Sequence, residues 1–463
     1  MAKTKYPQPT TGYAANGGVV MLGESNPVSG LNSVSCNRPK NNAILATQGD
    51  LPTDASDART PTVVSVSLFE GSLPLFSCSA DMAIQGQSTA NDQRKGYSLK
   101  FRNADTQSKL SVQIGDWLPV TKLDVKSYPL DRTYSRDTFC AWLWRTLRRS
   151  HDFPGGSICP QSVMSSAQAV NNGMQGGALF STDGFIVSHV HNGAFMGLYV
   201  LRTTGDTPDY LMDTTNPNHI MIQPNHAGNI WSTSFDSTQW AISSPDIAGY
   251  DDYDDISNTA PDVDAKCARL IQWFLNVNAG TVNMRATSYQ YINLDSWIDY
   301  ILMCEIVGSC DSITNNFQLC TWNGSVWYLC AYDMDETIGV ITKGDRPTND
   351  PAGMELIMDY LGSGAAQSNI FRLFYKYYTP EIRAAWRKLR DSGVVASKTF
   401  DRRLNEIVQT VSPSAFADDL AASPKSTADL SNFTTAGTSS MPYMMDWLQK
   451  RIAWLDVKWG YSG

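Results

Sequence analysis

Residues 308–339 have the sequence GSCDSITNNFQLCTWNGSVWYLCAYDMDETIG, and this stretch decides the fold and the site that we expect. Within it, residues 317–322 and 325–332 are strand-like runs joined by Asn323-Gly324. Asn-Gly between two strands strongly favours a hairpin, because both central residues of a type I′ turn need a positive φ. The sequence therefore predicts two antiparallel strands joined by a tight turn.

The register of this hairpin brings polar side chains to its open end. With a two-residue turn, Asn316 lies opposite Ala331. The hairpin is then expected to gather four oxygen-bearing side chains: Asp311, Asn316, Asp333 and Asp335. Carboxylates held close together repel one another unless a cation or hydrogen bonds compensate. Hard oxygen ligands favour Mg²⁺ over zinc, and Mg²⁺ commonly uses one or two carboxylates together with substrate phosphates.

The spacing of these residues is that of a protein-kinase catalytic loop. Asp311 and Asn316 are five positions apart. In a kinase catalytic loop the same spacing separates the Asp that accepts the substrate proton from the Asn that holds a metal ion. A later Asp near a Gly holds the bridging Mg²⁺ in kinases, and Asp333 or Asp335 with Gly339 would fill that role. The alternative is that these are turn and strand-end residues whose oxygens are satisfied by backbone groups.

A triphosphate would also need basic partners. Lys95 and Lys100 lie on or beside a predicted strand that follows the Gly-containing loop ending at Ser88, an arrangement that often holds phosphates. The alternative is that these are ordinary edge-strand lysines, which any edge strand can carry. Glu305 lies on the apolar stripe of a predicted helix, and buried Glu is rare unless it is paired. It would either pair with Lys95 or Lys100 or cap a neighbouring backbone group.

Composition excludes several classes of protein. The 463 residues carry a net charge of −9, which argues against non-specific nucleic-acid binding because that affinity comes mostly from Lys and Arg. The polar N-terminus lacks the apolar stretch of a secretory signal, and no run is long enough to span a membrane, so synthesis in the cytosol is expected. The nine Cys form no C-x-x-C pair and are expected to be buried free thiols, unless exposure outside the cell oxidises some of them.

The chain divides into an arm and one main domain. Residues 1–60 are rich in Gly, Pro, Ser, Thr and Asn and predict a loop-rich N-terminal arm. Residues 61–463 form the domain, with an irregular acidic insertion at about 205–265. Strands first and helices last predict an α+β fold. The expected strands are 62–68, 80–85, 97–102, 184–190 and 195–201, and the expected helices are 136–149, 294–307, 369–389, 401–411 and 441–459.

Two further patterns have both a functional and a structural interpretation. His189 and His191 would lie on one face of a strand, as half of a metal site or, more simply, as structural residues. Residues 250–255 (YDDYDD) suggest a calcium loop, but the EF-hand spacing with its Gly and closing Glu is missing, which favours a solvated acidic loop.

Motifs spread along the chain resemble those of the CotH family of spore-coat-type atypical protein kinases. The similar stretches are 86–88, 95–101, 134–137, 192–199, 294–339 and 447–459, so the resemblance covers roughly residues 62–460. It implies an atypical protein-kinase-like fold with a β-rich N-terminal part and a helical C-terminal part. It also implies binding of ATP with Mg²⁺ or Mn²⁺, and phosphorylation of Ser or Thr on a protein substrate. Carried over by position, Lys95 contacts phosphate, Asp311 is the base, and Asn316, Asp333 and Asp335 serve the metal.

Departures from the family pattern support a second hypothesis. The family usually has Arg-Gly-Asn-Ser at residues 85–88, which are Gln-Gly-Gln-Ser here, a Glu near Arg202-Thr203, and a Trp at Tyr332. A chain that keeps the fold without the chemistry would be a structural component of a multiprotein particle, such as a phage virion, a tail or capsid appendage, or a spore coat. The polar arm and the 13 Trp and 20 Tyr suit contacts with neighbouring particle proteins.

Replacement of the expected base tests the first hypothesis. Asp311→Ala should abolish any transfer of radiolabelled phosphate from ATP in the presence of Mg²⁺ or Mn²⁺, because the acceptor hydroxyl would lose its proton acceptor. Asp252→Ala, in the acidic loop, is the matched control and should leave transfer unchanged. Equal activity of both variants would contradict the assignment of Asp311.

Overall fold

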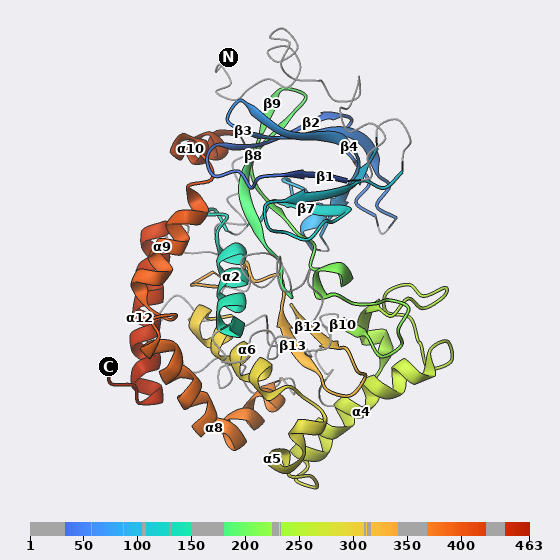
Figure 1. The fold of residues 1–463 in the computed structure, drawn as a ribbon, viewed down its shortest axis with the longest axis vertical. Coiled ribbons are helices and arrows are strands. Elements are labelled where there is room, and N and C mark those ends of the chain that lie inside the picture. Colours follow the sequence, from blue (N-terminus) through green and yellow to red (C-terminus); the bar gives the residue numbers. More distant parts are fainter. Residues whose placement is uncertain are drawn as a thin grey trace.

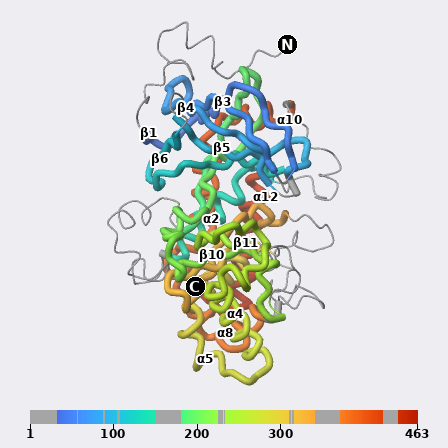
Figure 2. Tube along the Cα trace, turned by 90° about the vertical axis from the view of Figure 1, so that its right-hand side faces the viewer, coloured from blue at the N-terminus to red at the C-terminus, as the bar shows by residue number. Residues whose placement is uncertain are grey.

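The computed structural model divides into a β-rich half and a helical half (Figure 1). It describes residues 33–56, 58–86, 88–103, 108–129, 131–149, 180–224, 231, 233–309, 312, 316–340, 368–422 and 440–463. The side view in Figure 2 separates the strands β1 and β3–β6 at one end from β10, β11, α4 and α8 towards the other. This arrangement confirms the α+β class and the order of a β-rich part followed by a helical part.

The β-rich half is a closed barrel with strand order β2-β3-β4-β5-β7-β9-β8. Inward-facing apolar side chains fill the barrel interior, and the outward-facing apolar side chains of β2, β8 and β9 belong to a second buried cluster. The barrel strands are β2 (Ala43–Gly49), β3 (Thr62–Glu70), β4 (Leu73–Gln85), β5 (Gly96–Arg102), β7 (Lys122–Lys126), β8 (Gly184–His191) and β9 (Ala194–Arg202). Two short strands, β1 (Ser33–Cys36) and β6 (Ser111–Ile114), pair in parallel beside it.

The barrel closes through the parallel pair β2 and β8, where both predicted strand histidines lie. Thr47 Oγ1 is 2.8 Å from His189 Nε2 and 2.9 Å from His191 Nδ1. Burial, and then the neighbouring His191, lowers the pKa of His189 to about 3, so its ring is neutral. These contacts give the two histidines the structural role that the sequence favoured.

Two segments that the sequence assigns to irregular structure are ordered. β1 and β2 lie inside the predicted arm, so the prediction of a loop-rich arm is wrong for residues 33–49. β2 is a short apolar run between turn residues, and pairing with β3 and β8 makes it a buried strand. The predicted insertion likewise contains β10 (Ile220–Pro224), β11 (Trp240–Ser244) and the short 3₁₀ helices η3 (Thr207–Tyr210) and η4 (Ser237–Gln239).

β10 and β11 join the predicted hairpin in a second sheet of order β11-β10-β12-β13. The hairpin strands are β12 (Phe317–Thr321) and β13 (Tyr328–Ala331). Phe317 pairs with Ala331, so the predicted pairing of Asn316 with Ala331 is wrong by one residue.

The error lies in the turn. Gly324 has φ +66°, but Asn323 does not share the positive φ that a type I′ turn requires. Its side chain instead accepts hydrogen bonds from the amides of Ser325 and Val326, both at 2.9 Å, which makes a wider loop. Both strands are buried, so the shifted register still leaves apolar residues in the core.

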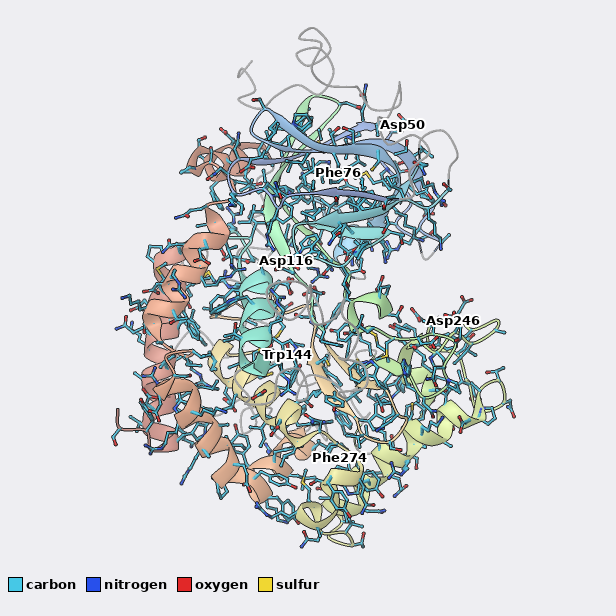
Figure 3. All side chains as sticks on the ribbon, in the orientation of Figure 1. Asp50, Phe76, Asp116, Trp144, Asp246 and Phe274 are labelled. Carbon is cyan, nitrogen blue, oxygen red and sulfur yellow. The ribbon has the colours of Figure 1, made fainter. Side chains whose placement is uncertain are left out.

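The helical half surrounds α6, which is buried along most of its length. The predicted limits 136–149, 294–307 and 441–459 match three helices, whereas α4 and α10 were not predicted. The helices are α2 (Arg136–Arg149), α4 (Pro261–Asn278), α5 (Met284–Thr287), α6 (Leu294–Val307), α8 (Ser368–Asp391), α9 (Ser397–Val408), α10 (Pro413–Ala422) and α12 (Met441–Trp459), with short 3₁₀ helices η1 (Ser88–Asn91) and η5 (Ser288–Gln290). Figure 3 places Phe76 in the barrel and Trp144 and Phe274 among the helices, and these belong to two separate buried clusters.

The cysteines and the helix compositions agree with what the sequence led us to expect. The cysteines within the described ranges are free thiols, and all are buried except the half-buried Cys36. No helix within those ranges combines the length and apolar character needed to cross a bilayer.

α10 returns from the helical half and docks on the barrel strand β9 (Figure 1). Asp419 of α10 is buried and pairs with Arg94, which lies just before β5. It also accepts hydrogen bonds from Tyr134 Oη and the backbone amide of Leu198, both at 2.8 Å. One carboxylate therefore connects α10 to the barrel and to the segment before α2.

Removal of this carboxylate should weaken the whole fold. Asp419→Ala leaves the buried Arg94 guanidinium without its charge partner, a defect that typically costs about 3 kcal/mol of unfolding free energy. Urea unfolding followed by circular dichroism measures the loss. Asp446→Ala is the control, because Asp446 pairs with Lys450 on the surface and should cost less than about 0.5 kcal/mol. Similar small losses in both variants would contradict the role of Asp419.

Candidate functional site

The residues that follow β13 lie where the barrel, α2 and the second sheet meet (Figure 1). Asp137, in the first turn of α2, accepts a hydrogen bond from the backbone amide of Met334 at 2.9 Å. Arg136, its neighbour, donates from Nε to the carbonyl of Thr337 at 2.9 Å and from Nη2 to that of Ile338 at 3.2 Å. The start of α2 therefore fixes the path of the segment that carries Asp333 and Asp335.

Arg202, the last residue of β9, is the centre of the charges at this point. Its guanidinium is fully buried, and Nη1 donates to Asp137 at 2.9 Å, to Asp333 at 3.1 Å and to Tyr128 Oη at 3.0 Å. Nη2 lies 3.6 Å from Asp124 of β7. The ring of Tyr332 lies 5.6 Å from the guanidinium carbon. Several elements thus converge on one arginine.

Lys126, at the end of β7, adds a second cation. Its Nζ lies 3.5 Å from Oδ1 of Asp333, whose side chain is 29% exposed. Burial alone would raise the pKa of Asp333, but Lys126 and then Arg202 hold it below its ordinary value. Lys122, Asp124 and Lys126 alternate with apolar residues along β7 and lie on its outward face.

Asp335 has a different electrostatic environment from Asp333. Burial, followed by the negative charges of Asp333, Glu336 and Asp137, raises the pKa of Asp335 well above its ordinary value. Lys126 only partly offsets these effects. The site therefore holds more carboxylate charge around Asp335 than its own cations balance.

The predicted cluster is brought together only in part. β12 begins opposite Ala331, so Asn316 and Asp333 lie at the same end of the hairpin. Both residues have positive φ, 46° and 47°. Asp311 lies outside the described residues, as does the side chain of Ser88. In the part of the chain that the structure describes, no group of three or more His, Cys, Asp and Glu side chains is arranged to hold a metal ion.

The predicted basic residues do not contact Asp333. Lys95 Nζ donates to the carbonyl of Ala90 at 2.7 Å, and Lys100 is exposed on β5, opposite Lys122. The basic residues beside Asp333 are Lys126 and Arg202 instead. β7 and β9 pair antiparallel with Asp124 opposite Arg202, which puts Arg202 and Lys126 on the same face of the strand pair. The alternation of charged and apolar residues at 122–126 was the sequence pattern that could have predicted a strand with Lys126 on its polar face.

The predicted pairing of Glu305 with Lys95 or Lys100 is also wrong. Glu305 is fully buried, and its carboxylate accepts from Arg451 of α12 at 2.9 Å and from Tyr375 of α8 at 2.8 Å. Arg451 Nε also donates to the Glu305 carbonyl at 2.8 Å. Sequence alone could not identify Arg451 as the partner, because 146 positions separate it from Glu305. These contacts give Glu305 a structural role in joining three helices.

Comparison with known families identifies the chain. The family model described as CotH kinase protein matches residues 82–455, which is most of the chain. The chain belongs to the CotH family. None of the curated proteins compared with it matches it. The CotH match includes the barrel strand β5, the α2 start and the β12–β13 hairpin, so every element of the site lies inside it.

The link from β9 to β10 in this CotH chain packs against the site. Gly205 has φ +71°, and an added Cβ would lie 3.3 Å from the ring of Tyr332. Its amide donates to Asp209 Oδ2 at 3.0 Å. Burial, and then the neighbouring Asp206, raises the pKa of Asp209 to about 8, so the carboxyl is largely protonated at neutral pH. The segment between β9 and β10 is thus held in part by the hydrogen bond from Gly205 to the largely protonated carboxyl of Asp209.

The protonation of Asp209 predicts a pH-dependent stability. Between its ordinary pKa and about 8 the folded state keeps a proton that the unfolded state has lost, so this residue contributes less to stability as pH rises. The unfolding free energy of Asp209→Asn should therefore increase relative to that of the wild type as pH rises from 5 to 8, by about 1.4 kcal/mol per pH unit at most. Urea unfolding at several pH values measures the difference. A constant difference would mean that Asp209 is ionised in the folded protein.

Proposed function

We propose that this chain binds ATP with Mg²⁺ or Mn²⁺ beside Asp333 and Asp335 and transfers the γ-phosphoryl group to a Ser or Thr hydroxyl of a protein. Membership of a family described as CotH kinase protein supports the reaction class. The arrangement of charges at the end of the β12–β13 hairpin supports the location.

The raised pKa of Asp335 is the observation that carries this proposal. Burial, and then the negative charges of Asp333, Glu336 and Asp137, raise this pKa, and the second cause marks a gathering of negative charge around Asp335. Structural ion pairs also perturb pKa values, but perturbed groups cluster at functional sites. A divalent cation would supply the missing positive charge. Mg²⁺ suits a site with few protein ligands because it keeps waters and takes phosphate oxygens as well.

The proposed roles follow from the position of each residue. Asp333 and Asp335 would hold the metal, with Asn316 at the same end of the hairpin. The metal would polarise and neutralise the phosphoryl oxygens when it is bound. Lys126, whose Nζ lies 3.5 Å from Asp333 Oδ1, would contact phosphate in the role first expected for Lys95 and Lys100.

Two residues complete this proposal. Asp311 remains the proposed base that would accept the hydroxyl proton. Asp137 would act as a positioning residue, because it binds the backbone between Asp333 and Asp335.

One observation favours the alternative of a structural particle component. Arg202 already pairs with Asp333 at 3.1 Å, so a cation of the protein itself partly neutralises the expected metal ligand. A chain that needs no ligand at this site would retain the fold as a scaffold in a phage virion or spore-coat-type particle. Neighbouring particle proteins would then be its partners, in place of a protein substrate.

A thermal-shift experiment separates the two functions. ATP with Mg²⁺ at about 100 times its dissociation constant should stabilise the protein by about 2.7 kcal/mol if it binds only the folded state. Asp335→Asn should raise the unfolding temperature in the absence of ligand, because it removes a carboxyl from a site that is rich in negative charge. The same variant should show a smaller increase in unfolding temperature when ATP and Mg²⁺ are added. Asp446→Asn, on the surface of α12, should change neither value.

Two results would contradict the kinase proposal. One is the absence of a shift with ATP and either metal, together with no transfer of labelled phosphate to the protein itself or to a casein-like substrate. The other is an Asp335→Asn variant that loses stability without ligand, because that would make Asp335 a structural residue.

A further inference from the structure

Of the Asn-Gly pairs in the chain, two lie in turns that the structure describes, and their asparagines make different contacts. Asn192 and Gly193 join β8 to β9, with φ of +48° and +79°. The Asn192 side chain is bound at both ends to Gly49 of β2. Its Nδ2 donates to the Gly49 carbonyl at 2.9 Å, and its Oδ1 accepts from the Gly49 amide at 3.1 Å. These two bonds hold the carboxamide of Asn192 on a neighbouring strand.

The carboxamide of Asn323 is instead bound to the backbone of its own turn. Its Oδ1 accepts from the amides of Ser325 and Val326, both at 2.9 Å. It also accepts from Thr321 Oγ1 at 3.1 Å. The two amides follow Asn323 by two and three residues, so these bonds draw Cγ over the backbone that starts at the Gly324 nitrogen. Asn323 itself is exposed to solvent.

The residue after Asn323 has to be glycine in this fold. Gly324 has φ +66°, and an added Cβ would lie 3.0 Å from Asn218 Oδ1 and 3.0 Å from two carbons of the Lys266 side chain. Glycine has no side chain to shield its nitrogen. The packing of the turn thus keeps beside Asn323 the residue whose backbone nitrogen is least obstructed.

We propose that Asn323 deamidates spontaneously in the folded protein, whereas Asn192 keeps its amide. The Gly324 amide gives its proton to hydroxide, and its nitrogen forms a bond to Cγ of Asn323. The bond from Cγ to Nδ2 then breaks, and Nδ2 takes a proton from water and leaves as ammonia. Water opens the resulting succinimide ring to aspartate or isoaspartate. The reaction needs only water and hydroxide.

The contacts of Oδ1 favour the step in which the ring forms. Attack at Cγ creates a tetrahedral intermediate whose negative charge lies on Oδ1. The three donors are already 2.9–3.1 Å from this oxygen, the arrangement that stabilises an oxyanion in acyl-transfer enzymes. Hydrogen bonds to a charged oxygen are stronger than those to a neutral carbonyl, so the intermediate gains more from them than the amide does.

The two products have different effects on the hairpin. An aspartate at position 323 can accept the same hydrogen bonds and adds one negative charge at the turn. Isoaspartate adds a methylene to the main chain between β12 and β13, at the opposite end of the hairpin from Asn316 and Asp333. The turn is therefore a place where the age of the protein changes its covalent structure.

Peptide mapping by mass spectrometry of the aged full chain tests this inference. The protein is incubated at mildly alkaline pH in H₂¹⁸O, so that products formed during incubation carry the heavy oxygen. Asn323 should be converted about tenfold or more faster than Asn192, because only its Cγ is held beside the attacking nitrogen. In urea, which removes both turns, the two rates should become similar.

Replacement of the hydroxyl donor tests the role of the Oδ1 contacts. Thr321→Val keeps the shape of the side chain and removes Oγ1, and it should slow the conversion of Asn323 by about tenfold. Thr321→Ser keeps the hydroxyl and is the matched control, with the rate of the wild type. Asn192 in the same samples should show no change, and circular dichroism confirms that each variant is folded.

Three results would overturn the inference. One is conversion of Asn323 no faster than that of Asn192 in the folded wild type, a comparison that needs no variant. Another is a difference that persists in urea, since it would then come from the neighbouring residue types. The third is an unchanged rate in folded Thr321→Val. None of these rates depends on ATP or metal, so the result is independent of the proposed function.

Discussion

The carboxylate of Asp137 is the constraint on which the site depends. It lies in the first turn of α2 and accepts from Tyr128, from Arg202 at the end of β9, and from the backbone of Met334. Those donors come from the barrel and from the segment after β13. Such a carboxylate is costly to bury unless its hydrogen bonds are satisfied, so the elements that supply them are held in one arrangement. The positions of Asp333 and Asp335 follow from it.

Charge is distributed unevenly around this point. Lys126 and Arg202 hold the pKa of Asp333 below its ordinary value, whereas burial, and then its acidic neighbours, raise the pKa of Asp335, two residues later. The pKa of one carboxyl is thereby lowered and that of the next is raised within a short stretch of chain. Divergent pKa values in neighbouring groups are typical of functional sites. The contacts of Lys126 and Arg202 with Asp333 support a phosphate site in the kinase proposal and a site that needs no ligand in the scaffold alternative.

Local patterns predicted the elements whose ends carry their own signals. α6 begins after Asn293, whose side chain accepts from the amide of Ser296, and ends at Gly308 with φ +68°. The predicted limits of α2 and α12 also match the structure, because apolar residues recur at helical spacing along both segments. β2 and β10 were missed, because each is a short run that is also paired with a strand far along the chain, β8 and β12 respectively. β11 was missed with them, since it pairs with β10.

The sequence by itself determined that a β-rich part precedes a helical part, that residues 317–331 form a hairpin, and that the motifs resemble those of the CotH family, to which the chain belongs. It also placed Asn316 and Asp333 at one end of that hairpin, because short-range spacing is enough for this. Only the tertiary structure decided that Arg202 and Lys126 face Asp333 and that Glu305 pairs with Arg451. Ion pairs between residues far apart in the chain depend on barrel closure and helix packing, and no local pattern encodes them.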